Sequence, residues 1–340
     1  MKALIYTAPN TMEYRDSPDP VAAGPSDALV RVEATGICGS DVLAYLGKDS
    51  RRPAPLTLGH EAAGTIVGGR RAGERVAINP LVTCGECDAC VAGQTNLCVQ
   101  REIISMAPRD GALAQFVTIP YRNLVTIPDN IPFEKACLVE PMACGWHVAR
   151  LCRRAVPRGR TGLVIGGGAI GLCAALSLHA QGVRDVKMVE ANTLRAGYLT
   201  SNCGQVVLPE SDLPKDPTFD IVIDAVGLEA TRTLACAQVK AGGVIGHIGL
   251  GDSLSGLDIR RMTLHEITFI GAYTYTVHDF DSTAAAMWDG RLGDLDWVEQ
   301  RPLSSGPAAF NDICKGQVAA PRVVLRPFEG AADVTDPIKR

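Results

Sequence analysis

The sequence of 340 residues has few aromatic residues (5%), a small net charge and no apolar run long enough to cross a membrane. Its 33 basic and 37 acidic side chains give a formal net charge of −4, and no basic run exceeds two adjacent arginines. The electrostatic footprint of a nucleic-acid-binding protein is therefore missing. The longest apolar stretch, residues 163–178, is shorter than the roughly 20 residues of a spanning helix and is interrupted by glycines. We expect neither a nucleic-acid partner nor a membrane partner.

The amino terminus also lacks the features of a secretory signal, namely a cationic flank, an apolar core and a small-residue cleavage site. This absence predicts a cytoplasmic location, where thiols stay reduced. The 12 cysteines are then expected to bind metal where they cluster and to be small buried residues where they are scattered. The chain length predicts two domains, each large enough to bury a core without disulfides.

The pattern of apolar, polar and turn-forming residues changes along the chain. Up to about residue 145, short β-rich segments are separated by glycine, proline and asparagine, which predicts an irregular β body. From about 160 to 272, apolar runs alternate with helical segments such as 169–181 and 229–240, which is typical of βαβ units on a parallel sheet. The residues after 273 are too few for a third domain, so we expect them to rejoin the β body through a helix near 279–288 and a strand at 320–325. The polar tail, 329–340, is expected to fray.

Four cysteines lie within one loop, with the spacing C-x2-C-x2-C-x7-C, at Cys84, Cys87, Cys90 and Cys98. Four thiolates on a chain that can fold back tightly can close a tetrahedral shell with no position left for a substrate, which defines a structural Zn²⁺ site. An iron–sulfur cluster also uses four thiolates, but its usual spacings differ and often end in Cys-Pro. Structural zinc is the prediction, and a cluster or disulfides are the alternatives.

A glycine-rich turn, Gly166-Gly-Gly-Ala-Ile-Gly171, follows an apolar strand and opens an apolar helix, and Glu190 ends the next strand. This is the context of a dinucleotide-binding site: a tight turn, close approach of the pyrophosphate to a helix N-terminus, and a carboxylate for the ribose hydroxyls. Glu190 would repel a 2′-phosphate, so NAD is predicted rather than NADP, although Arg195 lies nearby. The simpler alternative is that the glycines only tighten a strand–helix turn.

A third group is dispersed: Cys38-Gly-Ser40-Asp41, then His60-Glu61, then Glu140-Pro141. A thiol, an imidazole and carboxylates are sensible ligands for a zinc ion that keeps one exchangeable position. These residues are far apart in the sequence, however, so their spacing alone does not show that they bind one metal ion. Taken singly, each side chain also fits a structural role, as a buried thiol, a satisfied core histidine or a solvated acid.

Read in order along nearly the whole chain, these motifs resemble the zinc-dependent medium-chain dehydrogenase/reductases, the alcohol dehydrogenase superfamily. The resemblance is carried by 36–41, 59–64, 73–76, the four-cysteine loop and the glycine turn. Glu140-Pro141 is similar to the polyol (sorbitol-type) and threonine dehydrogenase branch. The resemblance implies a GroES-like, mostly β catalytic domain from 1–143 and 273–340, and an α/β Rossmann domain with a doubly wound parallel sheet from 144–272.

The resemblance also implies roles for the dispersed residues. Cys38 and His60 resemble the fixed ligands of a catalytic zinc, and Glu61 and Glu140 would complete the shell, one of them through water. A second, structural zinc would occupy the four-cysteine loop. The expected cofactor-binding residues are Gly166, Gly168, Ala169, Ile170, Gly171, Glu190, Arg195, Val226 and Ile248.

Two further roles follow from the same resemblance. Ser40 would take the proton of the substrate hydroxyl, and Asp41 would hold the second ring nitrogen of His60. Leu43 stands where many relatives have a histidine, so the proton relay is expected to end in water. Near the position of Thr274, sorbitol dehydrogenases have an arginine that binds the polyol. This chain lacks that arginine, which disfavours sorbitol itself as the substrate. Tyr45, Tyr273 and Tyr275 are expected to line the pocket.

The resulting prediction is a zinc-dependent, NAD-linked oxidoreductase that converts a secondary alcohol of a polyol, sugar acid or related small polar alcohol to a ketone, reversibly. The enzyme alternatives are an L-threonine 3-dehydrogenase and a general secondary alcohol or butanediol dehydrogenase. The non-enzyme alternative is a catalytically silent, zinc-stabilised binding protein. The resemblance further predicts a homo-oligomer, a dimer or a homotetramer, through edge strands around 267–275.

Overall fold

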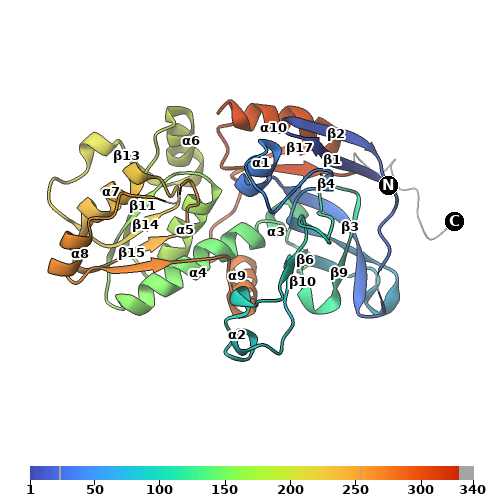
Figure 1. Ribbon diagram of the computed structural model, residues 1–340, viewed down its shortest axis with the longest axis horizontal. Helices are drawn as coiled ribbons and strands as arrows, with labels where there is room; N and C mark the ends of the chain where they lie inside the picture. Colours follow the sequence, from blue (N-terminus) through green and yellow to red (C-terminus); the bar gives the residue numbers. More distant parts are fainter. Residues whose placement is uncertain (23, 253, 329–340) are drawn as a thin grey trace.

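Two large sheets of different character organise the chain in the computed structural model, which describes residues 1–22, 24–252 and 254–328. A mostly β half and a half built on a parallel sheet lie side by side and are joined by helices, as Figure 1 shows. The expectation of a frayed tail at 329–340 lies outside the described residues. The fold class predicted from the sequence is confirmed.

The β half is built on a seven-stranded sheet with the order β10-β6-β5-β3-β18-β17, in which β9 also pairs with β3. Alternate residues of β3, including Ala28, Val30 and Val32, are fully or almost fully buried, as expected for a strand with one face on a core. Its strands are β3 (Asp27–Gly36), β5 (Glu61–Val67), β6 (Arg75–Ile78), β9 (Phe116–Pro120), β10 (Leu124–Thr126), β17 (Val298–Pro302) and β18 (Arg322–Arg326).

The end of the chain returns to this sheet. Strand β18 pairs antiparallel with β3, so that Val324 lies opposite Gly36 and Leu325 opposite Thr35. The expectation that the last segment rejoins the β body is therefore confirmed. Two smaller sheets flank it, composed of β1 (Lys2–Ala8), β2 (Thr11–Asp16) and β4 (Leu56–Thr57), and of β7 (Leu81–Val82) and β8 (Glu102–Ile103).

The second half contains six parallel strands in the order β13-β12-β11-β14-β15-β16, the doubly wound order of a Rossmann sheet. Its central strands are mostly apolar and buried because helices cover both faces. The strands are β11 (Thr161–Ile165), β12 (Asp185–Val189), β13 (Val206–Leu208), β14 (Phe219–Asp224), β15 (Val239–His247) and β16 (Thr268–Gly271). The accompanying helices are α5 (Ala169–Ala180), α6 (Thr193–Cys203), α7 (Glu229–Gln238) and α8 (Ile259–Leu264).

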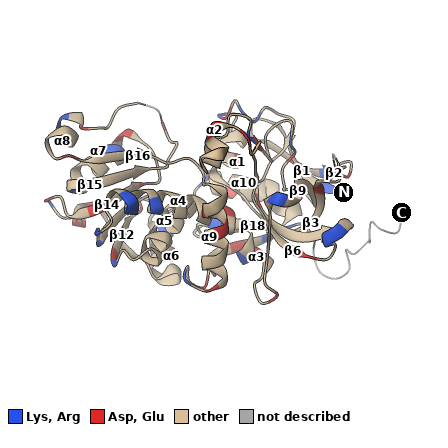
Figure 2. Cartoon of the chain, turned by 90° about the horizontal axis from the view of Figure 1, so that it is seen from below, with Lys and Arg blue, Asp and Glu red and all other residues tan. Residues whose placement is uncertain are grey.

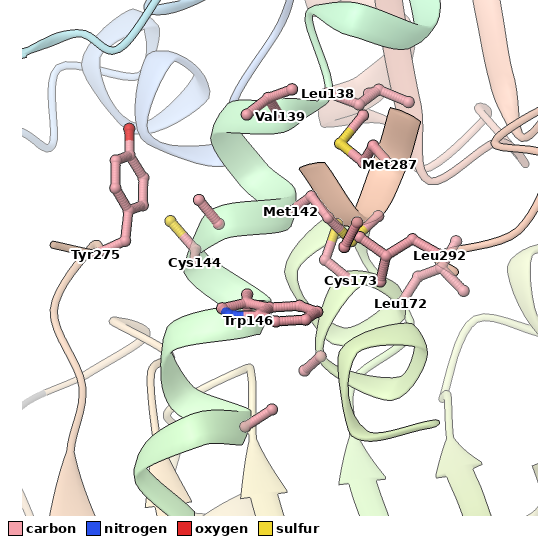
Figure 3. Close-up of a cluster of buried hydrophobic side chains, with 14 of the residues drawn as sticks. Leu138, Val139, Met142, Cys144, Trp146, Leu172, Cys173, Tyr275, Met287 and Leu292 are labelled. Atoms are coloured by element: carbon pink, nitrogen blue, oxygen red, sulfur yellow. The ribbon is translucent and has the colours of Figure 1, made fainter. Parts of the chain in front are cut away.

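Helix α4 (Val139–Ala155) lies in the main core and connects the two halves. Its buried side chains pack against α5 and against α9 (Val277–Trp288), as Figure 3 shows for Met142, Cys173 and Met287. Gly145 allows the close approach of α5, because a Cβ there would lie 2.4 Å from the backbone of Cys173. The junction predicted between residues 143 and 144 falls inside α4, so this helix belongs to the packing of both halves.

The remaining helices are short and lie in the β half: α1 (Gly39–Tyr45), α2 (Asp88–Val91), α3 (Phe133–Ala136) and α10 (Gly306–Cys314). Basic and acidic positions are interspersed over both halves, as Figure 2 shows. Among the described residues, no helix is both long and apolar enough to cross a membrane.

Candidate active site

The first site residues lie where β3 ends and α1 begins. Cys38 precedes the first turn of α1, and its backbone N–H donates to Asp41 Oδ2 at 3.0 Å. Asp41 is fully buried, and its Oδ1 accepts from the N–H of Gly59 (3.2 Å) and from the hydroxyl of Ser105 (3.3 Å). This carboxylate therefore fixes the strand–helix turn that carries Cys38 against the turn that precedes His60.

A thiol, an imidazole and a carboxylate converge at this point. One ligand atom from each of Cys38, His60 and Glu61 lies within 4.8 Å of the other two. Glu61 is fully buried, and neither of its oxygens has a hydrogen-bond partner in the described part of the chain. Gly36 leaves room for it, because a Cβ at that position would come 2.3 Å from Glu61 Oε2. Such a donor set, with two buried carboxylate oxygens that accept no hydrogen bond, fits a zinc ion.

The second ring nitrogen of His60 faces Asp41. Nδ1 lies 3.5 Å from Asp41 Oδ1, which is the distance of an ion pair and too long for a well-formed hydrogen bond. Burial opposes the charged forms, but the mutual attraction of these groups dominates. It lowers the pKa of Asp41 to about 2 and raises the pKa of His60 well above its usual value. Burial likewise opposes ionisation of Cys38, yet the charge of His60 lowers the pKa of this thiol to about 5.

Glu140 comes from the first turn of α4 and stands apart from the three-residue group. It lines the same cavity as Cys38 and His60, whereas Glu61 does not. The hydroxyl of Tyr275 donates to Glu140 Oε1 at 2.8 Å, and burial raises the pKa of this carboxyl to about 7. The two carboxylates that the sequence treats alike therefore occupy different positions: Glu61 belongs to the three-residue group but does not line the cavity, whereas Glu140 lies on the cavity wall.

Sequence reasoning missed Arg322 altogether. This buried arginine of β18 places Nη2 3.0 Å from Glu61 Oε1 and donates through Nη1 to the carbonyl oxygen of Ile37. The ion pair explains how a fully buried carboxylate is tolerated beside a thiol. Nothing in the local sequence of β18, an arginine before an apolar run, marks this role, because the pairing depends on the return of the chain to β3.

The four-cysteine loop closes on itself around α2. The sulfur atoms of Cys84, Cys87, Cys90 and Cys98 lie within 4.8 Å of one another, and the Sγ of Cys84 is 3.5 Å from Cys98 and 3.9 Å from Cys90. A tetrahedral zinc with Zn–S bonds of about 2.3 Å requires sulfur–sulfur distances of about 3.8 Å. A disulfide would require about 2.05 Å. The geometry fits a closed zinc site and does not fit the disulfide alternative.

The glycine-rich turn links β11 to α5. Gly166 has a φ of +97°, and a Cβ on Gly171 would lie 1.8 Å from the carbonyl oxygen of Gly166, so both positions require glycine. A Cβ on Gly168, at the N-terminus of α5, would meet nothing within 4 Å. This free space above a helix N-terminus fits a pyrophosphate.

Glu190 follows β12 and faces this turn. Its Oε2 accepts from the N–H of Gly167 and its Oε1 from the N–H of Asn192, both at 2.7 Å. Arg195, on α6, places Nη1 3.7 Å from Glu190 Oε2. The carboxylate is thus held beside the glycine turn, where ribose hydroxyls would meet it, and the nearby arginine is already paired with it.

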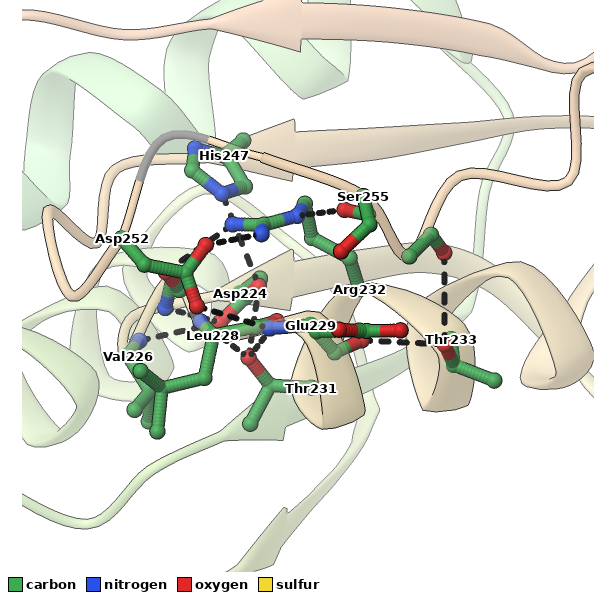
Figure 4. Close-up of polar contacts among 12 residues, drawn as sticks. Asp224, Val226, Leu228, Glu229, Thr231, Arg232, Thr233, His247, Asp252 and Ser255 are labelled. Atoms are coloured by element: carbon green, nitrogen blue, oxygen red, sulfur yellow. Dashed lines mark hydrogen bonds and ion pairs between the residues drawn. The ribbon is translucent and has the colours of Figure 1, made fainter.

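A polar network supports the opposite side of the cofactor region, as Figure 4 shows. Asp224, at the end of β14, accepts from the backbone N–H groups of Val226 (2.9 Å) and Gly227 (2.8 Å). Arg232 of α7 donates to the carbonyl oxygens of Gly227 (2.9 Å) and Ser255 (2.6 Å). These bonds hold the turns after β14 and β15, which carry Val226 and Ile248, in place.

One cavity of about 360 Å³ joins these parts. Ser40, His60 and Glu140 line it from one side, and Ile170, Val226 and Ile248 line it from the Rossmann half. Two of the three metal-ligand residues, Cys38 and His60, therefore open onto the same space as three of the predicted cofactor residues. Its volume suits a nicotinamide and a small substrate.

The three tyrosines expected in the pocket have three different positions. Tyr273 lines the cavity, whereas Tyr275 is buried behind Glu140, and Tyr45 packs against Phe310 with ring centroids 5.2 Å apart. The expectation is therefore wrong for Tyr45 and Tyr275. Leu43 lines the cavity, as does Ser40.

Comparison with known proteins agrees with this arrangement. Residues 24–129 match the alcohol dehydrogenase GroES-like domain, and residues 169–289 match the zinc-binding dehydrogenase domain. The chain is 30% identical over 337 residues to a probable D-xylulose reductase A of Neosartorya fischeri, covering 91% of this chain and 90% of that protein. The chain belongs to the zinc-containing alcohol dehydrogenase family.

Other members of the zinc-containing alcohol dehydrogenases are similarly close. Sorbitol dehydrogenase of Bacillus subtilis is 32% identical over 295 residues, which cover 81% of this chain and 82% of that protein. The solved structure of alcohol dehydrogenase TADH from Thermus sp. ATN1 superposes with a TM-score of 0.86 at 25% identity, covering 96% of this chain and 99% of the other. Membership of this family agrees with the resemblance drawn from the motifs, and it makes the chain a dehydrogenase of the polyol branch.

Proposed function

We propose that this protein oxidises a secondary hydroxyl of a small polar alcohol to a ketone with NAD⁺ as the hydride acceptor. The overall reaction, alcohol + NAD⁺ ⇌ ketone + NADH + H⁺, balances without a further reductant. The observation that supports this function best is the shared cavity, because the thiol of Cys38 and the imidazole of His60 open onto the same space as predicted cofactor residues of the Rossmann half. Relatives named for xylulose and sorbitol favour a polyol or sugar-acid substrate.

Each residue of the site has a proposed role. Cys38 and His60 would hold a catalytic zinc, with Glu61 and Glu140 as the carboxylates that complete its shell, directly or through water. Asp41 orients His60 from behind. Bound zinc would supply Lewis acidity toward the substrate oxygen, and bound nicotinamide would accept the hydride.

Ser40 would accept the proton of the substrate hydroxyl and pass it on. Because Leu43 lines the cavity beside it, the chain offers no histidine at that position, and the proton would leave through water. Glu190 would accept hydrogen bonds from the adenosine ribose, which favours NAD over NADP. The glycine turn, together with Ala169 at the start of α5, would hold the pyrophosphate.

The finer organisation is also part of the proposal. Cys84, Cys87, Cys90 and Cys98 would hold a second, structural zinc, giving two ions per chain. The chain would act as two domains, residues 1–143 with 273–340 for catalysis and 144–272 for the cofactor, in a cytoplasmic homo-oligomer. We propose that the exposed edge formed by β16 pairs between subunits of a dimer or tetramer.

The test combines metal analysis with cofactor reduction. Purified protein is expected to contain about two zinc ions per chain and to reduce NAD⁺ with at least one compound in a panel of alditols, aldonates, threonine, butanediol and simple alcohols. Threonine as the best substrate would instead support the L-threonine 3-dehydrogenase alternative. One zinc per chain and no turnover with any compound would refute the enzyme and support the binding-protein alternative.

A further inference from the structure

The cavity wall contains two arginines to which the proposed reaction gives no role. Arg51 and Arg52 line it, and both contact the nearly buried carboxylate of Asp49. Arg51 donates from Nε (2.9 Å) and Nη2 (3.0 Å), and Arg52 donates from Nη1 (2.6 Å). Two guanidinium groups thus share one carboxylate. Glu140 is the only carboxylate on the described cavity wall, and Tyr275 already binds it. Among Arg51, Arg52 and Asp49, two positive charges therefore meet one negative charge, an excess of one positive charge.

The two arginines differ in what they can still bind. Arg52 is buried, with 3% of its side chain exposed, and its Nε donates to the carbonyl oxygen of Ser105 at 3.1 Å. Arg51 is 48% exposed, and no acceptor contacts its Nη1 in the described part of the chain. Hydrogen bonding to Asp49 raises the pKa of Arg51, so this group stays charged. Arg51 is therefore the arginine with donors free for a ligand.

A second, independent observation points to a ligand in the same cavity. Thr274 lines it, and its Oγ1 is buried without a hydrogen-bond partner in the described chain. Its φ of +47° lies in the left-handed region, which a β-branched residue rarely adopts. A buried hydroxyl without a partner is unfavourable, and strained backbone of this kind is typical of functional sites. This hydroxyl has no partner within the described chain, and we take it as the partner of a hydroxyl group of a substrate.

We infer that the substrate is a polyhydroxy acid, whose carboxylate is bound by Arg51 and one of whose chain hydroxyl groups bonds to Thr274. This inference rests on the proposed function and names its substrate class. A carboxylate is favoured because its planar pair of oxygens matches the fork of a guanidinium and its single charge matches the single excess charge among Arg51, Arg52 and Asp49. A dianionic phosphate would exceed that charge. Arg51 is then a specificity-determining residue of the reaction.

The test compares acids with matched neutral alcohols. NAD⁺ reduction is measured with D-gluconate and L-idonate, with sorbitol and galactitol, and with galactitol 1-phosphate. We expect at least one aldonate to exceed the alditols in kcat/KM by about tenfold or more. Arg51→Gln is expected to reduce the ratio of aldonate to alditol kcat/KM by about 10- to 100-fold, mainly through KM, because one charge-assisted contact is lost.

Arg291→Gln provides the matched control. Arg291 donates from its backbone N–H and Nε to Asp289, two residues earlier, as Arg51 does to Asp49, and it is 51% exposed. It does not line the cavity. The aldonate-to-alditol ratio of Arg291→Gln is expected to match that of the unmodified protein. Thr274→Val, which keeps the side-chain shape, is expected to raise KM for aldonates severalfold without loss of zinc.

A binding measurement separates this inference from the proposed function. Calorimetry of D-gluconate and L-idonate with the zinc-loaded, NADH-bound protein detects binding where no hydride can be transferred. We expect Arg51→Gln to raise Kd by about tenfold or more for at least one acid. If no alcohol is oxidised, the proposed function fails, but the calorimetry still decides the carboxylate site. Alditols preferred over aldonates, with the ratio unchanged in Arg51→Gln, would overturn the inference alone. A preference for galactitol 1-phosphate over both classes would also overturn it.

Discussion

One buried carboxylate adds polar contacts to the apolar packing between α9 and α4, and its removal tests how much these polar contacts stabilise the fold. Asp279 is fully buried near the start of α9. It contacts the Nδ1 of His147 at 2.7 Å and accepts from Arg150 Nη2 at 2.9 Å and from the hydroxyl of Thr276 at 2.7 Å. Replacement by asparagine keeps the size of the side chain but removes its charge.

The expected cost follows from these contacts. Removing one partner of a buried ion pair typically costs about 3–5 kcal/mol. Because 28% of the Arg150 side chain is exposed and the amide keeps one acceptor oxygen, we expect Asp279→Asn to lower the free energy of unfolding by about 2–4 kcal/mol at pH 7. Urea titration measures this difference.

The effect has a defined pH dependence. Burial acts to raise the pKa of Asp279, but the hydrogen bonds from His147, Arg150 and Thr276 outweigh it and hold the pKa well below its usual range. The folded-state pKa therefore lies below the unfolded value of about 3.9. The stabilisation is fully present above about pH 4 and is lost as the pH falls further. The difference in the free energy of unfolding between the unmodified protein and Asp279→Asn should thus become smaller as the pH falls from 7 to 3.

Asp281→Asn is the matched control, since Asp281 is an exposed carboxylate of the same helix. It should change the free energy of unfolding by no more than about 0.5 kcal/mol. Equal losses in the two variants would refute the argument. A loss for Asp279→Asn that is the same at pH 3 and pH 7 would refute it as well.

Three further predictions concern the site. Glu190→Ala should raise KM for NAD⁺ about tenfold and increase the NADP⁺/NAD⁺ ratio of kcat/KM; preference for NADP⁺ in the unmodified protein would show that the account of Glu190 is wrong. Cys98→Ser should lower the zinc content from two ions per chain to one by metal analysis, and two retained ions would exclude the four-cysteine site. Tyr275→Phe leaves a buried oxygen of Glu140 unpaired and should lower the free energy of unfolding by about 1–3 kcal/mol in urea, whereas no change would contradict that role.

Local sequence patterns were sufficient to predict those elements and sites whose residues are close together in the sequence. A strand ending at Glu190 was predicted, and β12 ends one residue earlier, at Val189, with its apolar residues Val186, Met188 and Val189 buried. The four-cysteine loop was readable because all its ligands lie within fifteen residues. The glycine turn could be recognised for the same reason, since its strand, turn and helix follow one another directly in the sequence.

Features that depend on contacts between distant segments of the chain could not be predicted from local patterns. Cys38, His60 and Glu140 carry no mutual spacing signal, and only resemblance to a family joined them. The different positions of Glu61 and Glu140 follow from Arg322 and Tyr275, which lie far along the chain. The strand β17 was missed because its polar sequence, V-E-Q-R-P, has no apolar alternation and is ordered by pairing with β18.

The return of β18 to the first half also sets an order of events during synthesis. Arg322 bonds to the carbonyl oxygen of Ile37, a residue made 285 positions earlier, and balances the charge of Glu61. At roughly 5–20 residues per second, a ribosome needs about 15–60 s to make the intervening chain. Throughout this interval the nascent chain has Cys38, His60 and Glu61 but not the arginine that pairs with Glu61. The metal-ligand group is therefore assembled in its final form only after translation of the last described strand.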